Sequence, residues 1–132
     1  MSPLHFPPAA EEGVRLFNER RYFEAHDVLE EIWIDRTGLE KTFYQGLIQV
    51  AVGFYKVAVE NHGGALSLLR KGLGKLRAVG DLDSPLDTER LIRETEEALV
   101  EIDRLGQARI AEFDLREAPQ IHRRDDVDVV LD

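Results

Sequence analysis

The chain has 132 residues, a formal net charge of −9, a hydrophobic fraction of 43% and no cysteine. This length suits one domain with a buried core, and the lack of cysteine excludes disulfides, thiolate zinc sites and cysteine nucleophiles. The excess of carboxylates disfavours binding to nucleic acid or to anionic membranes, because both depend on clustered lysine and arginine. The pairs Arg20-Arg21 and Arg123-Arg124 are the candidate local exceptions.

We expect neither a membrane span nor a signal peptide. No apolar run approaches the roughly 20 residues of a membrane span, and the first residues lack the basic and then hydrophobic order of a signal peptide. We therefore expect a cytoplasmic protein.

Five helices are predicted, over about residues 8–20, 22–35, 39–61 and 65–79, with the fifth opening at Ser84. Pro7-Pro8 suits the start of the first helix. The second helix is expected to stop near Thr37-Gly38, and Gly80 closes the fourth. The third ends at His62-Gly63-Gly64, where glycine suits the left-handed turn at a helix end. Short connections favour antiparallel neighbours, and strand patterns are scarce. We expect an all-α fold, a compact antiparallel bundle of about five helices with an extended C-terminal tail.

The fifth helix is marked by Ser84-Pro85-Leu86-Asp87, which reads as a serine cap followed by proline in the first turn. Its apolar residues then recur at helical spacing up to Leu105. Beyond Gly106 the pattern weakens. We expect a single helical domain over residues 1–106, and an extension over 107–132 that packs on the body or is partly disordered. Residues 125–130 suggest a short strand or disorder.

The segment 39–61 is apolar around almost its whole circumference, which is typical of a buried helix. Its polar residues Gln45, Gln49 and Lys56 fall within about 40° of each other at roughly 100° per residue, in one narrow stripe. Glycines at 46, 53 and 72 cost about 1 kcal/mol each relative to alanine, so we expect them to permit close helix packing.

The second helix carries the main polar feature of the sequence. On a helical wheel His26 lies at the centre of an arc formed by Tyr22, Phe23, Leu29 and Trp33, and Glu30 lies inside that arc. An unpaired buried carboxylate costs several kcal/mol, so Glu30 needs a partner, and His26 is one turn away. We expect a buried His26–Glu30 pair.

An antiparallel hairpin around Gly38 would bring His26 level with Gln49 and Glu30 level with Gln45. The polar stripe of the third helix would then meet the polar pair of the second. The alternative is that the stripe faces water.

Three motifs occur in order. His26, Glu30 and Trp33 have the spacing His-x3-Glu-x2-Trp, Gln-Gly-Leu-Ile-Gln follows at 45–49, and Asn-x-x-Gly-Ala at 61–65. With these motifs the chain resembles the prokaryotic family known as domain of unknown function 309, over roughly residues 14–80. The resemblance implies a compact helical bundle and no assigned activity, and it adds Asn61 to the candidate residues.

Function stays open between three classes. In the first, His26, Glu30, Gln45 and Gln49 form a structural hydrogen-bond network that fixes helix register. In the second, His26 is a general base oriented by Glu30. It lies in a small-molecule pocket lined by aromatic and amide side chains, where hydrolysis by activated water is the natural chemistry. The residues proposed to line this pocket are Tyr22, Trp33, Gln45, Gln49, Tyr55 and Asn61.

The third class is a helical interaction module, favoured by a weak likeness of segment 20–33 to helix-turn-helix repeats. An acidic surface would suit a basic peptide or a second copy of the chain. A metal site built from His26 and Glu30 with His62 or Glu60 matches no metal motif of helical proteins. We therefore expect no metal and no cofactor, and whether the protein is an enzyme is left open.

Overall fold

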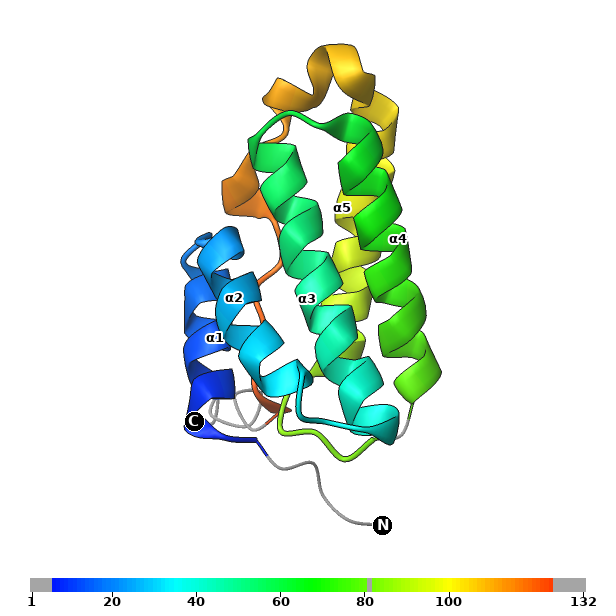
Figure 1. Ribbon diagram of the computed structural model, residues 1–132. Coiled ribbons are helices and arrows are strands. Elements are labelled where there is room, and N and C mark those ends of the chain that lie inside the picture. Colours follow the sequence, from blue (N-terminus) through cyan, green and yellow to red (C-terminus); the bar gives the residue numbers. More distant parts are fainter. Residues whose placement is uncertain (1–5, 81, 125–132) are drawn as a thin grey trace, which may run out of the picture.

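The computed structural model describes residues 6–80 and 82–124. Its elements are five α-helices and two short 3-10 helices: α1 (Pro8–Asn18), α2 (Tyr22–Trp33), α3 (Gly38–Ala58), α4 (His62–Val79), α5 (Thr88–Arg109), η1 (Ile110–Glu112) and η2 (Leu115–Glu117). Consecutive α-helices run antiparallel, and α3 lies between α2 and α4 (Figure 1). The expected all-α bundle is confirmed. No described helix is long and apolar enough to cross a membrane.

The core is built around α3, whose inward side buries residues that include Phe43, Tyr44, Leu47 and Phe54. An aromatic cluster ties α1 and α2 to it. The ring of Phe17 lies 5.3 Å from that of Tyr22 and 6.3 Å from that of Phe54, with both pairs edge to face. Edge-to-face pairs add about 0.5–1.5 kcal/mol beyond the burial of their area.

The contact between α3 and α4 depends on glycine, as expected. A Cβ atom added at Gly72 would lie 3.0 Å from the backbone oxygen of Gly46 and 3.0 Å from the backbone nitrogen of Val50. One added at Gly53 would lie 2.7 Å from Cγ of Leu69. Without side chains at these positions, the two helices approach more closely than alanine would allow.

The junction between α3 and α4 differs from the prediction. The left-handed residue is Glu60 (φ 59°), not a glycine, and α3 already ends at Ala58. Asn61 is the N-cap of α4, and its Oδ1 accepts a hydrogen bond of 2.9 Å from the Gly64 backbone N–H. An asparagine cap satisfies an otherwise unpaired donor of the first turn, so the helix begins at His62 and includes both glycines.

The start of α5 was also predicted too early. Asp87 caps the helix by accepting a hydrogen bond of 3.1 Å from the Arg90 N–H, whereas Ser84 Oγ accepts from the Leu86 N–H in the preceding turn. The Asp87 N–H donates to the carbonyl oxygen of His122 at 2.7 Å. This pairing with the C-terminal segment keeps the backbone before Thr88 out of the helical conformation.

The segment 110–124 returns along the bundle towards α1 (Figure 1). Gly106 (φ 70°, ψ 178°) interrupts the helical conformation of α5. Ile110 and Ile121 are buried in the core. Asn18 holds Ile121 from both sides, because its Oδ1 accepts from the Ile121 N–H at 2.7 Å and its Nδ2 donates to the Ile121 oxygen at 3.0 Å. The expectation for 125–130 lies outside the described residues.

Candidate functional site

His26 and Glu30 are adjacent, but they lie at the surface. Nε2 of His26 is 3.3 Å from Oε2 of Glu30, and 54% of the Glu30 side chain is exposed against 19% of that of His26. The expected burial of Glu30 is therefore wrong. Water solvates this carboxylate, and an exposed pair of this kind contributes at most about 1 kcal/mol.

The error came from the aromatic residues of α2. The wheel counted Phe23 and Trp33 as buried, which centred the apolar arc on His26. In the structure Phe23 is 50% exposed and Trp33 is only half-buried. The buried side of α2 is formed by Tyr22, Ala25, Leu29 and Ile32, so His26 lies at its edge and Glu30 beyond it.

The expected polar network is not formed. Gln45 and Gln49 are half-buried, but among the described residues no hydrogen bond joins either amide to His26 or Glu30. Oε1 of Gln49 is buried there without a hydrogen-bond partner. The polar stripe of α3 therefore lies on its half-exposed side, between α2 and α4, and does not meet a buried polar pair.

Besides the carboxylates of α2, the His26 ring contacts an aromatic side chain. The ring centroid of His26 lies 5.3 Å from that of Phe23, and Phe23 lies 5.1 Å from Tyr55 on α3. We call these three residues, Phe23, His26 and Tyr55, the aromatic patch. Phe23 was not among the predicted site residues, although its position beside Glu30 on the helical wheel indicates that the two share a side of α2.

The other ring nitrogen of His26, Nδ1, lies 3.2 Å from Oδ1 of Asp27. This is an ion-pair distance, but Nδ1 has no hydrogen-bond partner among the described residues, so the angle is unsuited to a hydrogen bond. A general base needs a fixed tautomer, and this contact does not provide one.

The remaining predicted residues have other roles in the fold. Tyr22 is buried among core aromatics, and burial raises the pKa of its phenol to about 12. Trp33 lies under Lys41, whose Nζ is 4.2 Å from the ring centroid. Asn61 caps α4. Of the predicted set, Glu30 and Tyr55 are the residues that the structure brings to the surroundings of His26.

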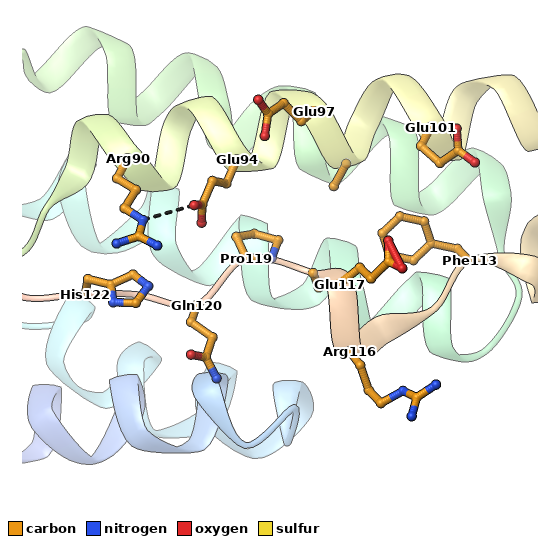
Figure 2. Close-up of a pocket in the computed structure, with 12 residues that line it drawn as sticks. Arg90, Glu94, Glu97, Glu101, Phe113, Arg116, Glu117, Pro119, Gln120 and His122 are labelled. Carbon is orange, nitrogen blue, oxygen red and sulfur yellow. Dashed lines mark hydrogen bonds and ion pairs between the residues drawn. The ribbon is translucent and has the colours of Figure 1, made fainter.

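Two cavities occur elsewhere in the described chain, and His26 and Glu30 line neither. One, of about 520 Å³, lies between α5 and the C-terminal segment. Figure 2 shows Glu94 pointing from α5 towards that segment, with its carboxylate held by Arg90 at 3.0 Å. At its far end the guanidinium of Arg104, which donates to Glu101, lowers the pKa of that carboxyl. The carboxylates of Glu94 and Glu101 are thus already paired.

The second cavity, of about 820 Å³, lies at the connection between α4 and α5 and includes Leu76 and Ile92. Among the described residues, no group of three or more histidine, aspartate or glutamate side chains is arranged to hold a metal ion.

Comparison with known proteins places the aromatic patch in a shared segment. The model of the family described as Domain of unknown function (DUF309) matches residues 10–68. The DUF309 resemblance is confirmed. The matched segment contains most of α1, all of α2 and α3 and the beginning of α4, and hence all of the aromatic patch.

A relative is the uncharacterized protein YpuF of Bacillus subtilis (strain 168), which is 40% identical over 78 residues. The alignment covers 55% of this chain and 44% of YpuF. The chain therefore spans less than half the length of this relative.

Proposed function

We propose that this chain is a helical protein-binding module, and that the aromatic patch on α2 and α3 is its contact surface. The observation that carries the proposal is that Phe23 is 50% exposed yet packed between His26 and Tyr55. Aromatic side chains are the commonest anchors of protein interfaces. A ring that its neighbours already hold loses less conformational entropy when a partner covers it.

The apolar surface continues along α3. Val59, one turn beyond Tyr55, is 51% exposed, and Ile48 and Val52 on the same side are half-buried. Covering the exposed half of a phenylalanine removes roughly 100 Å² from water, which contributes about 2–3 kcal/mol. The patch thus offers one strong anchor and an apolar strip beside it.

Binding fits this surface better than catalysis. A histidine base oriented by a carboxylate gains most where water is excluded, whereas more than half of the Glu30 side chain is exposed. The pair also lines neither cavity described above. An exposed aromatic surface needs no cavity to bind a partner.

The test is a random peptide library displayed on phage and selected on the immobilised protein. Enriched peptides are synthesised and their affinities measured for the wild type, for Phe23→Ala and for Val100→Ala. Val100 is the matched control, because it is an exposed apolar residue (71%) on α5. Both substitutions remove exposed side chains, so circular dichroism should show intact folds.

We expect Phe23→Ala to weaken binding about 30-fold, as loss of an interface anchor of about 2 kcal/mol does, and Val100→Ala to leave it unchanged. Failure to enrich any peptide, or equal affinity of the Phe23→Ala variant, would contradict the proposal.

A further inference from the structure

Basic residues are concentrated in one part of the chain. Residues 41–80 contain six lysines and arginines and a single carboxylate, Glu60. The rest of the chain holds the other 11 basic residues and 25 carboxylates. The net acidity that suggested a basic partner therefore does not apply to α3 and α4, which together carry a local positive charge.

All four lysines of the chain, Lys41, Lys56, Lys71 and Lys75, lie on these two helices. Within residues 6–80 and 82–124, every ion pair is made by arginine or histidine, and none by lysine. The lysine charges are thus not neutralised by neighbouring carboxylates, and that of Lys41 lies over the Trp33 ring.

The lysines lie on the outer side of α3 and on the neighbouring helix α4. At roughly 100° per residue, Lys41 and Lys56 lie within about 60° of each other, on the side that carries Gln45. Cβ of Lys75 would lie 3.2 Å from a Cβ added at Gly46, so Lys75 flanks α3 from α4. Lys71 is one turn away on the same side of α4.

Beside these charges, towards Phe23 of α2, runs the apolar strip of α3, formed by Ile48, Val52, Tyr55 and the C-cap residue Val59. We infer that the partner presents an acidic amphipathic helix along the outer side of α3, an inference that rests on the proposed function. Apolar residues of that helix cover the strip and Phe23, while its carboxylates meet the lysines of α3 and α4. Helix-in-groove binding of this kind uses anchors at helical spacing.

The length of the partner helix follows from the lysines. At 1.5 Å rise per residue, Lys41 and Lys56 are about 22 Å apart along α3, which a helix of about 15 residues spans. A nucleic acid fits less well, because aliphatic side chains separate the lysines and the remaining surface is strongly acidic. A second copy bound through the same face also fits less well, because it would bring the two sets of lysines together and their like charges would repel.

The probe is a fluorescein-labelled peptide of about 18 residues, roughly five helical turns, with leucines along one face and glutamates along the other. A peptide of the same composition in shuffled order is the control for general stickiness. Binding is followed by fluorescence anisotropy with the wild type, Lys56→Glu and Arg93→Glu. Arg93 is an exposed arginine on α5, and its reversal changes the net charge equally.

We expect the amphipathic peptide to bind and the shuffled one not to bind. The affinity for the amphipathic peptide should fall at least about fivefold in Lys56→Glu and should not change in Arg93→Glu. Equal losses in both variants, or no binding of the amphipathic peptide, would overturn the inference. If the affinity of library-selected peptides still depends on Phe23, the proposed function is retained and only the acidic partner is rejected. If that affinity does not depend on Phe23, both are rejected.

Three competing occupants are tested in parallel. Single-stranded DNA or phosphatidylserine vesicles would be assigned to this surface, in place of the acidic helix, if they bind more tightly than the amphipathic peptide and lose that binding in Lys56→Glu. Self-association in sedimentation equilibrium that Phe23→Ala abolishes would assign the face to a second copy.

Discussion

Substituting the two glycines at 72 and 74 of α4 should change stability in opposite directions. In Gly72→Ala the new methyl group would lie 2.8 Å from Cγ2 of Val50 and 3.0 Å from two backbone atoms of α3, the Gly46 oxygen and the Val50 nitrogen. Backbone atoms cannot rotate away, so α3 and α4 must separate. Overpacking of this kind costs about 1–3 kcal/mol, which equals or exceeds the gain of about 1 kcal/mol in helix propensity.

Gly74 is the matched control. It is exposed on the same helix, and a Cβ added there has no atom within 4 Å. Gly74→Ala therefore keeps the propensity gain without a clash, and we expect about 0.5–1 kcal/mol of added stability. For Gly72→Ala we expect a net loss of roughly 1 kcal/mol in the free energy of unfolding.

Urea denaturation followed by far-ultraviolet circular dichroism measures both free energies with the same probe. The expected order of stability is Gly74→Ala, wild type, Gly72→Ala. A Gly72→Ala variant as stable as Gly74→Ala would show that α3 and α4 do not approach as closely as described, and the reasoning would be refuted.

Three further changes probe the rest of the fold. Asn18→Ala removes both hydrogen bonds to the Ile121 backbone, so hydrogen exchange at Ile121 should accelerate; unchanged protection would mean that packing alone holds the C-terminal segment. Burial raises the pKa of Tyr22 and of Tyr44 to about 12. Since the unfolded chain loses these protons first, stability should decline as pH rises from the ordinary phenol value of 10.0 towards 12. Tyr22→Phe should fold normally at neutral pH, because the Tyr22 hydroxyl has no hydrogen-bond partner among the described residues. The variant should also lose less stability between pH 10.0 and 12; a loss equal to that of the wild type would contradict the role of the buried phenol. Asp87→Ala should lose about 1 kcal/mol through the missing cap, and a loss near zero in thermal unfolding would indicate another cap.

The helices could be located from the sequence because each has an apolar side at helical spacing. The close-packing glycines could be recognised because Gly53 and Gly72 interrupt apolar faces, where alanine would otherwise be favoured. The ends of helices were harder to place. The cap of α5 is set by the pairing of residues 86–87 with 122–124, a contact between distant segments that local patterns do not reveal.

The candidate site was predicted only in part. Spacing alone identified His26 and Glu30 as neighbours, since residues four apart on a helix always share a side. Burial could not be predicted in the same way, because it depends on whether a neighbouring helix covers a side chain. Phe23 is apolar and still half exposed, so an apolar arc on a wheel overestimates what the core encloses.

The most direct test of the central claim is nuclear magnetic resonance mapping of a library-selected peptide on the isotope-labelled protein. We predict that the largest amide and ring shifts fall on Phe23, His26 and Tyr55 and fade towards α5. Shifts centred instead on the groove between α5 and the C-terminal segment, around Glu94 and His122 (Figure 2), would contradict the assignment of the aromatic patch as the binding surface.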